Sequence, residues 1–139
     1  MFATAPQSPT PVKEQFHPLV ARYFESLNQE DFLGVSQLFA PEGCLLPPFE
    51  EEIIGPTAIA RYLYKEARGM KFVPHKVADV QRRADGTSQS QIVGKAHSPL
   101  FSVHVAWTFT FTNKQTLQQL SVKLLASPEE LLKLQSQAN

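Results

Sequence analysis

The side chains whose types and spacing suggest chemistry are two aromatic hydrogen-bond donors, Tyr23 and Trp107. Trp107, the single tryptophan, stands in a segment, residues 101–112, in which large apolar side chains alternate with small polar ones. Tyr23 lies on the apolar stripe of a segment with helical periodicity. A buried indole N–H or phenol O–H normally finds an acceptor, and neither apolar stripe carries a carboxylate or an amide. One ligand oxygen could accept from both donors, with ordered water in its place when the cavity is empty. The alternative is that both rings only pack in the core.

The remaining groups that could do chemistry are scattered. Acid–base catalysis needs an Asp, Glu or His that projects into a pocket with a shifted pKa. The acids fall mostly in turns and at helix ends: Glu30, Asp31, Glu42, Glu50 to Glu52, Asp79, Asp85, Glu129 and Glu130. His104 is on the strand face opposite Trp107, and His17, His75 and His97 lack the spacing of metal ligands. The sequence therefore predicts neither a catalytic centre nor a metal site, and an enzyme is kept as a competing hypothesis.

Length and charge limit the class of protein. The chain has 139 residues, the length of one domain. Its 13 basic and 13 acidic residues cancel, which excludes an overall field that attracts nucleic acid or an anionic membrane. No run reaches the roughly 18 apolar residues needed to cross a bilayer. Cys44, the single cysteine, excludes an internal disulfide and indicates a cytoplasmic location. It is either a small core residue or a link between two chains.

The first half of the chain is predicted to be mainly helical. Residues 1–11, rich in proline, are expected to form a flexible arm, and residues 12–139 to form the domain. Apolar residues at three- and four-residue steps predict a first helix that begins at His17, with Pro18 in its first turn. Two further helices are expected over 29–39 and 57–68.

The second half is predicted to be mainly strands, because the period changes to two after Gly69. A short strand is expected earlier, over 44–46, and the others follow one another as a meander: 71–82, 87–98, 101–112 and 116–126. Ser127 and Glu130 form a capping box that starts a short helical tail over 128–134. Three helices followed by an antiparallel meander indicate an α+β architecture and not a βαβ one.

The segment 101–112 has two different faces. Its apolar face is expected to line the inside of a curved sheet: Phe101, Val103, Val105, Trp107, Phe109 and Phe111. Its other face is small and weakly polar: Ser102, His104, Ala106, Thr108, Thr110 and Thr112. Because this outer face lacks the Lys and Glu of a freely solvated strand, it predicts a homodimer through the outer sheet face. The alternative is a plain solvent face of high β-propensity.

A set of short motifs carries a family resemblance. They occur in order and with matching spacing: Leu27-Asn28, Asp31-Phe32, Leu38-Phe39-Ala40, Pro47-Pro48-Phe49, Ile54-Gly55, Gly94-Lys95, Ala106-Trp107 and Leu124-Leu125-Ala126-Ser127-Pro128. Over about residues 12–134 the sequence closely resembles the C-terminal domain of the orange carotenoid protein, a member of the nuclear transport factor 2-like superfamily. It looks like a stand-alone homolog of that domain, of the kind found in cyanobacteria. The resemblance implies a cone of three helices closed against a bent antiparallel sheet.

The resemblance also implies a ligand, a ketocarotenoid of the canthaxanthin or echinenone type. Its keto oxygen would accept hydrogen bonds from Tyr23 and Trp107. The positions expected to line its ring and polyene are Leu27, Ile54, Met70, Phe72, Pro99, Val105, Leu120 and Val122. The implied behaviour is a homodimer that shares one carotenoid, transfer of pigment to or from helical carotenoid proteins or membranes, and quenching of singlet oxygen by the bound polyene.

Two positions bear on docking of a helical partner. Leu100 stands where the family has a tryptophan that holds its N-terminal domain, which argues against light-switched docking of that type. Glu66 matches the acidic partner of an interdomain arginine, so a docking surface is expected there, unless Glu66 is an ordinary exposed glutamate of a helix. A pure protein-interaction module without pigment is a further competing hypothesis, and the colour of the purified protein discriminates between them.

Overall fold

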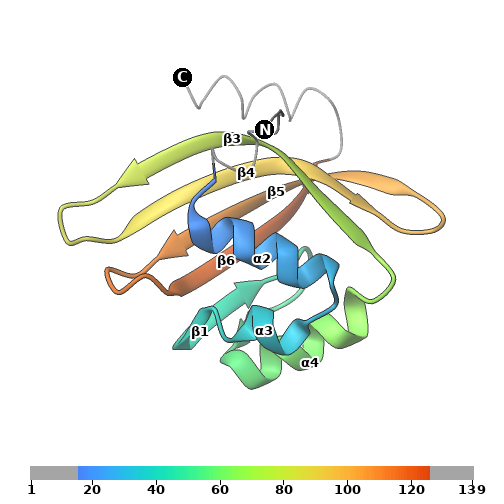
Figure 1. Cartoon of the computed structure of the whole chain (residues 1–139), viewed down its shortest axis with the longest axis horizontal. Coiled ribbons are helices and arrows are strands. Elements are labelled where there is room, and N and C mark those ends of the chain that lie inside the picture. The colour runs from blue at the N-terminus through green and yellow to red at the C-terminus, as the bar shows by residue number, and fades with distance from the viewer. Residues whose placement is uncertain (1–15, 126–139) are drawn as a thin grey trace, which may run out of the picture.

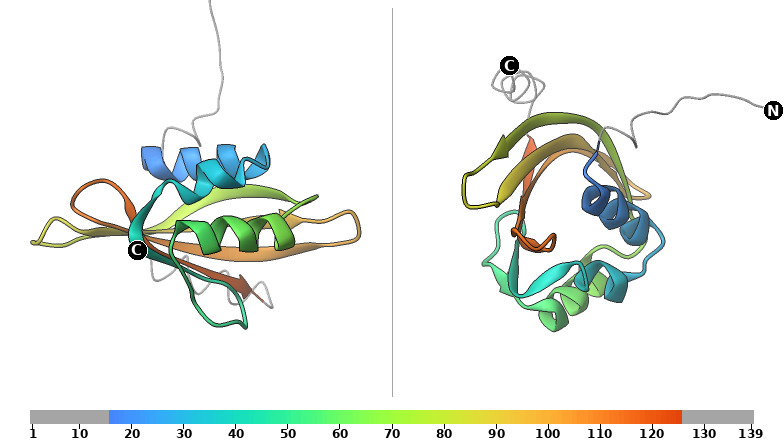
Figure 2. Two further views of the ribbon diagram at one scale, coloured as in Figure 1. Left: turned by 90° about the horizontal axis from the view of Figure 1, so that it is seen from below. Right: turned by 60° about the vertical axis from the view of Figure 1, so that its left-hand side comes forward.

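Three helices cover the concave face of one strongly curved sheet. The structure, a computed structural model, describes residues 16–125, so the predicted arm over 1–11 and the predicted tail over 128–134 lie outside the described residues. The elements are α2 (Pro18–Asn28), α3 (Phe32–Ser36), β1 (Phe39–Leu46), β2 (Ile53–Ile54), α4 (Pro56–Glu66), β3 (Lys71–Arg82), β4 (Ser88–His97), β5 (Ser102–Phe111) and β6 (Leu117–Leu125). The sheet has the order β2-β1-β6-β5-β4-β3 and wraps around α2, while α3 and α4 close the open side (Figures 1 and 2). The predicted α+β class is confirmed.

The start of α2 follows from its sequence. His17 is the N-cap, and its Nδ1 accepts a hydrogen bond from the backbone N–H of Leu19 at 3.0 Å. Pro18 takes the first helical position, where its missing N–H leaves no bond unmade. The predicted start of this helix is therefore confirmed.

The second helix is shorter than predicted. The prediction extended it over 29–39, but α3 ends at Ser36 and β1 begins at Phe39. The carbonyl of Leu38 accepts a hydrogen bond from the backbone N–H of Leu117 at 2.8 Å, so sheet pairing replaces the last helical turn. The Pro-Glu-Gly run at 41–43 then falls at an irregularity of β1 and does not end a helix.

The sheet is mixed, which corrects the prediction of an antiparallel sheet. Strands β3, β4, β5 and β6 form the expected antiparallel meander, but β1 pairs with β6 in parallel, with Leu45 beside Leu120. Alternation along a strand predicts which face is buried and carries no information about the direction of a distant partner.

The end of α2 is fastened to the start of β3 by one side chain. The Asn28 amide donates to the carbonyl of Phe72 and accepts from its N–H, both at 2.8 Å. The same strand continues through Pro74 and changes register twice, between Pro74 and Lys76 and between Val77 and Asp79. These features bend β3 over the helices.

Replacing Asn28 by Ala is expected to lower the free energy of unfolding by about 2 kcal/mol, because two partly buried backbone groups lose their partner. Urea denaturation measures this change. As a matched control, Asn113→Ala removes one exposed 3.4 Å bond to the Asp85 carbonyl and is expected to change stability by less than about 0.5 kcal/mol. Equal stabilities of the two variants would contradict this role of Asn28.

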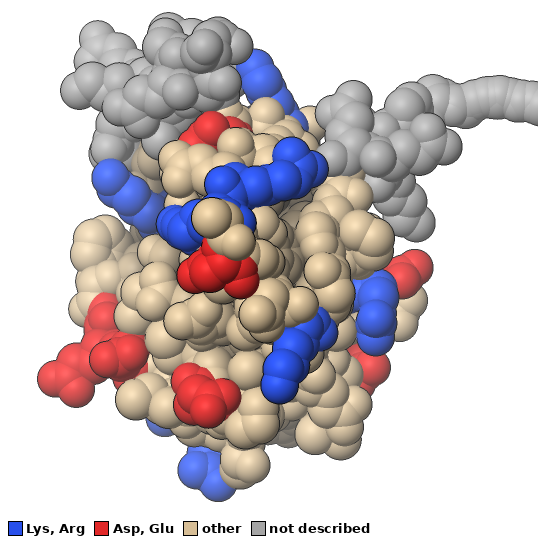
Figure 3. Space-filling model, turned by 90° about the vertical axis from the view of Figure 1, so that its left-hand side faces the viewer, with Lys and Arg blue, Asp and Glu red and all other residues tan. Residues whose placement is uncertain are grey.

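The convex face of the sheet carries rows of Gln and Thr side chains, one of which continues to Asp79 on β3, and a small apolar cluster. Gln89 donates to Thr110 at 3.3 Å and Gln91 to Thr108 at 3.4 Å, across the β4–β5 pair. Beside these rows Ala78, Val93, Ala106 and Leu125 form a cluster of buried residues. In the view of Figure 3 acidic and basic side chains are interspersed, and neither sign gathers into a broad field.

Candidate functional site

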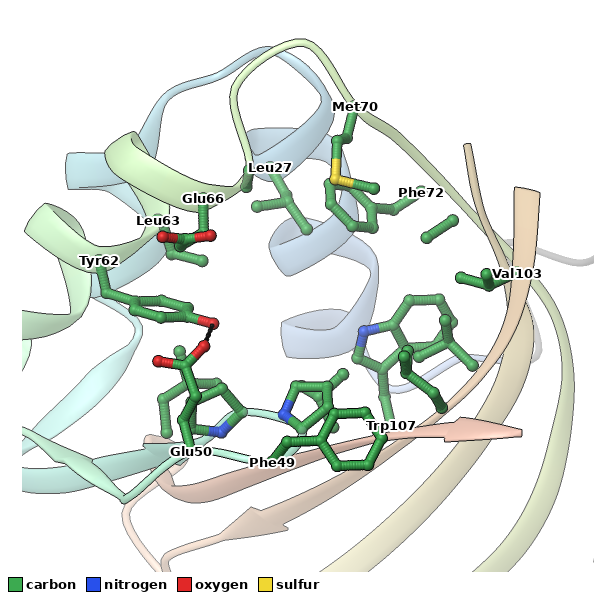
Figure 4. Close-up of a pocket in the computed structure, with 18 of the residues that line it drawn as sticks. Leu27, Phe49, Glu50, Tyr62, Leu63, Glu66, Met70, Phe72, Val103 and Trp107 are labelled. Carbon is green, nitrogen blue, oxygen red and sulfur yellow. Dashed lines mark hydrogen bonds between the residues drawn. The ribbon is translucent and has the colours of Figure 1, made fainter. Parts of the chain in front are cut away.

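A cavity of about 350 Å³ lies between the helices and the concave face of the sheet. Its walls come from α2, α4, β1, the β1–β2 loop and strands β3 to β6. The lining residues are Tyr23, Leu27, Leu45, Pro47, Pro48, Phe49, Glu50, Tyr62, Leu63, Glu66, Ala67, Met70, Phe72, Ala96, Phe101, Val103, Val105, Trp107, Val122 and Leu124. Figure 4 shows the polar side chains Glu50, Tyr62 and Glu66 on one side and Trp107 with Val103 on the other. The cavity thus has one wall that is apolar apart from the Trp107 N–H and one wall with carboxylate and hydroxyl groups.

The structure brings the two predicted donors to this one cavity. Tyr23 is buried on α2, with 3% of its surface exposed, and Trp107 is buried on β5, with 1% exposed. The Trp107 ring packs edge to face on the Phe24 ring, with centroids 4.8 Å apart. The Tyr23 ring packs on the Phe109 ring in the same way, with centroids 5.3 Å apart. These contacts fix the rings, so each polar tip has a defined position.

Both donors lack an acceptor among the residues that the structure describes. Within 16–125 the Tyr23 hydroxyl and the Trp107 indole N–H make no hydrogen bond. A buried donor without a partner costs about 1–3 kcal/mol. A ligand oxygen in the cavity that accepted from either donor would remove that cost for the donor it reached.

The other residues predicted at the site fall into two groups. Besides the two donors, six of the predicted positions line the cavity: Leu27, Glu66, Met70, Phe72, Val105 and Val122. Three predicted positions do not line it. Ile54 on β2 is 59% exposed, Pro99 is exposed in the β4–β5 turn, and Leu120 is fully buried beside Phe109, one row beyond Trp107.

The sequence did not indicate the β1–β2 loop or two of the three polar-wall residues, Glu50 and Tyr62. Phe49 and Glu50 lie in an irregular loop, where no periodicity marks a side chain as facing the interior. Tyr62 could have been found, because it shares the apolar side of α4 with Ile59 and Leu63. Its hydroxyl donates to Glu50 Oε2 at 3.3 Å, and burial together with the charge of Glu50 raises its pKa to about 12.

Two carboxylates border the cavity, against the expectation that the acids lie elsewhere. Glu50 and Glu66 both line it, and both are exposed side chains. A carboxylate becomes a useful base when burial or a neighbouring charge shifts its pKa. These two carboxylates lie across the cavity from Trp107 (Figure 4).

The border of the cavity also presents exposed apolar side chains. Phe49 is 92% exposed and Phe101 is 59% exposed, and both line the cavity. Leu100, next to Phe101, is 93% exposed. Exposed large apolar side chains at a cavity border are typical of a site that meets a ligand or a partner.

The burial of Tyr23 predicts a dependence of stability on alkaline pH. Burial, with a smaller contribution from Tyr62, holds the pKa of Tyr23 well above its ordinary value of 10.0. A group whose pKa is raised on folding stabilises the fold below its unfolded pKa and loses that contribution as the pH rises further. Between about pH 9 and about pH 11 the free energy of unfolding is expected to fall by about 1.4 kcal/mol more in wild type than in Tyr23→Phe. Urea denaturation of both proteins at both pH values checks this. An equal fall in the free energy of unfolding for wild type and Tyr23→Phe would contradict it.

The remaining reactive groups form no second centre in the described part of the chain. Cys44 is half-buried, and its thiol donates to Gln119 Oε1 at 3.7 Å. Burial and the neighbouring Glu52 raise the pKa of this thiol. Among residues 16–125 no three His, Cys, Asp or Glu side chains gather as metal ligands would. Within the same range no helix has the length and apolarity to cross a membrane.

The amino-acid sequence matches a known domain family and two proteins of known name. The model of the nuclear transport factor 2 (NTF2) domain matches residues 17–133. The orange carotenoid-binding protein of Limnospira maxima is 33% identical over 119 residues, which are 83% of this chain and 37% of that protein. The protein of the same name from Synechocystis sp. (strain ATCC 27184 / PCC 6803 / Kazusa) is 29% identical over 133 residues, which are 93% of this chain and 42% of that protein. The chain therefore spans about two fifths of the length of these relatives.

Solved structures agree with this relationship. The orange carotenoid protein of Anabaena (Nostoc) sp. PCC 7120, solved with canthaxanthin bound, superposes with a TM-score of 0.79 at 31% identity, over 85% of this chain and 38% of that chain. A ketosteroid isomerase-like protein from Erwinia carotovora atroseptica superposes with a TM-score of 0.64 at 12% identity, over 84% of this chain and 95% of that chain, and shares the fold alone. The predicted fold family and the predicted resemblance to the C-terminal domain of the orange carotenoid protein are confirmed.

Proposed function

Because this chain belongs to the nuclear transport factor 2 domain family and matches orange carotenoid-binding proteins along most of its length, we propose that it binds a ketocarotenoid in the cavity. The observation that carries the proposal is the pair of buried donors, Tyr23 and Trp107, which have no acceptor among the described residues. A keto oxygen has two lone pairs and can accept from both. A terminal keto ring of the canthaxanthin or echinenone type supplies that oxygen on an otherwise apolar body.

The size and lining of the cavity indicate how such a ligand would lie. Leu27, Phe72 and Val105 provide apolar contacts for its ring. The volume of about 350 Å³ is near the lower end of the range of about 300–1,000 Å³ for small-molecule sites. We therefore propose that the ring end is enclosed and that the polyene leaves past Phe49 and Phe101, whose exposed rings shield it from water.

A polyene that leaves the cavity needs a second apolar cover, which supports pigment transfer. We propose that a helical carotenoid protein or a membrane gives or receives the pigment at this border, with Glu66 as a docking contact for a helical partner. We also propose a homodimer through the Gln and Thr rows of the convex face, which lies away from the cavity and leaves this border free. Quenching of singlet oxygen by the bound polyene, a cytoplasmic location and the absence of catalysis complete the proposal.

Expression in a host that makes canthaxanthin tests the function. The purified protein is expected to be coloured, with absorption shifted to longer wavelength than free canthaxanthin in organic solvent. Light scattering, which gives the mass in solution, and quantification of the pigment together distinguish two dimer arrangements. A convex-face dimer carries one pigment molecule per chain, whereas a dimer that shares one polyene carries one pigment molecule per two chains. A colourless protein from a host that contains free canthaxanthin would overturn the proposal.

One observation favours a competing function, acid–base catalysis, because Glu50 and Tyr62 form a hydrogen-bonded pair at the cavity. Both groups are poorly suited to it: Glu50 is exposed, and the raised pKa of Tyr62 keeps its hydroxyl protonated at neutral pH. Glu50→Gln separates the two functions, since it should leave pigment binding intact and would abolish turnover by a Glu50 base.

A further inference from the structure

A second hollow lies at the other end of the concave face, where α2 begins. It has a volume of about 560 Å³ and lies between the start of α2, the β3–β4 hairpin and the end of β5. Its lining residues are Phe16, His17, Pro18, Val80, Arg82, Arg83, Gly86, Thr87, Ser88, Gln89, Ser90, Phe111 and Gln115. Of these, none lines the first cavity.

The strand register shows how the concave face changes towards this hollow. Around Trp107 the row is wholly apolar, with Ile92 on β4 as its neighbour. Two residues further along β4 the row contains Ser90, paired with Phe109 and Val80, and the next contains Ser88, paired with Phe111 and Arg82. Hydroxyl and guanidinium groups therefore replace apolar side chains at this end.

Ser90 is a buried hydroxyl without a partner in the described part of the chain. It is 6% exposed, and its Oγ makes no hydrogen bond to any residue within 16–125. The other buried serine, Ser36, donates to the Leu33 carbonyl at 2.7 Å. A buried hydroxyl that lines a hollow and lacks a protein acceptor is available to a ligand.

The charge of the lining has one sign. Among the described residues of the lining, Arg82 and Arg83 are the only charged groups at neutral pH, since none of these residues is a carboxylate and burial lowers the pKa of His17. The neighbouring carboxylate, Asp85, accepts hydrogen bonds from the Thr87 N–H at 3.0 Å and from the Thr87 hydroxyl at 2.7 Å. The charge of Asp85 interacts with that of Arg83, while no carboxylate among the described lining residues opposes Arg82.

The floor of the hollow is flat and apolar. The His17 ring stacks on the Phe111 ring, with centroids 4.1 Å apart and planes 12° apart. Pro18 and Val80 extend this surface. An aromatic body can lie against such a surface, with an anionic group towards the arginines.

We propose that this hollow binds a small organic anion with an aromatic body, of the aryl carboxylate class. Its carboxylate pairs with Arg82 and Arg83 and accepts from the Ser90 hydroxyl, and its ring packs against His17, whose own ring stacks on the buried Phe111. The site is independent of the carotenoid cavity, so its failure would leave the proposed function untouched.

Titration with benzoate, followed by the amide resonances of the labelled protein, tests the proposal. Saturable shifts are expected for Thr87, Ser90 and Gln115. Acetate, which has the charge without the ring, and benzyl alcohol, which has the ring without the charge, are each expected to bind about tenfold or more weakly. Benzoate shifts that do not saturate, or that spread over the whole surface, would overturn the proposal.

Substitutions of the lining residues test which side chains bind the carboxylate of benzoate. Arg82→Gln is expected to raise the dissociation constant of benzoate about tenfold and Ser90→Ala about threefold, because the first removes a charged hydrogen bond and the second a neutral one. Arg61→Gln, an exposed arginine of α4 outside the lining, is the matched control and should leave the constant unchanged. Equal constants for wild type and for the variant with both Arg82 and Arg83 replaced by Gln would refute the site even if every variant folds normally.

Discussion

Tyr23→Phe is expected to weaken the retention of a ketocarotenoid about tenfold while leaving the empty protein as stable as wild type or more stable. The hydroxyl that this change removes is buried and has no acceptor among the described residues. In the empty protein its loss removes an unsatisfied donor, and in the loaded protein it removes a bond to the keto oxygen. The opposite signs of the two effects separate a ligand-binding group from a group that only packs.

Trp107→Phe together with Tyr23→Phe is expected to lower pigment affinity about a hundredfold and to shift the absorption maximum towards that of free pigment. The tryptophan change also leaves a small void, so its stability is measured alongside. Tyr62→Phe is the matched control: it is a cavity tyrosine whose hydroxyl already bonds to Glu50. If Tyr23→Phe and the double variant keep the pigment and its spectrum as Tyr62→Phe does, the keto group does not bind at these donors.

Gly94→Ala is expected to destabilise the fold by more than about 3 kcal/mol, the upper end of the usual cost of overpacking. Gly94 lies on β4 beside Pro74 of β3. A Cβ at this position would overlap the carbonyl oxygen of Val73 and would approach the Pro74 Cα to 2.9 Å. Both are backbone atoms of a paired strand, so they cannot move aside as the end of a long side chain can.

Gly69→Ala is the control for this effect. A Cβ on Gly69 meets nothing within 4 Å, so only the positive φ of 79° opposes the change. That strain costs about 1 kcal/mol. Thermal or urea unfolding should therefore show that Gly94→Ala is much less stable than Gly69→Ala. Similar stabilities would show that β3 does not approach β4 as closely as described.

Residues with a local periodic signal could be predicted from the sequence. The alternation around Trp107 predicted which face of β5 is buried, and the stripe on α2 predicted that Tyr23 points inwards; the structure buries both. The bounds of β3, 71–82, also agree with the prediction, because its alternation is bordered by Gly69 and by a turn. These features depend on neighbours in sequence, which a single chain records directly.

Features that depend on distant contacts could not be predicted. The parallel pairing of Leu45 with Leu120 joins segments far apart in the chain, and nothing in either segment records its direction. The position of Glu50 at the cavity follows from the path of an irregular loop. The alignment of Ser90 with Val80 requires the β3–β4 register, which the bulges of β3 shift. In each case tertiary contacts decide the outcome.

The two hydrogen bonds between Asn28 and the backbone of Phe72 bear on resistance to aggregation. β3 is the last strand in the order of the sheet, and such a strand can recruit a strand of another molecule through its free backbone groups. Along β3 the Asn28 side chain already occupies both backbone groups of Phe72, Pro74 has no N–H to offer, and two register shifts twist the strand. Edge-to-edge growth into fibrils is thereby opposed, and a variant such as Asn28→Ala removes one of these safeguards along with its share of stability.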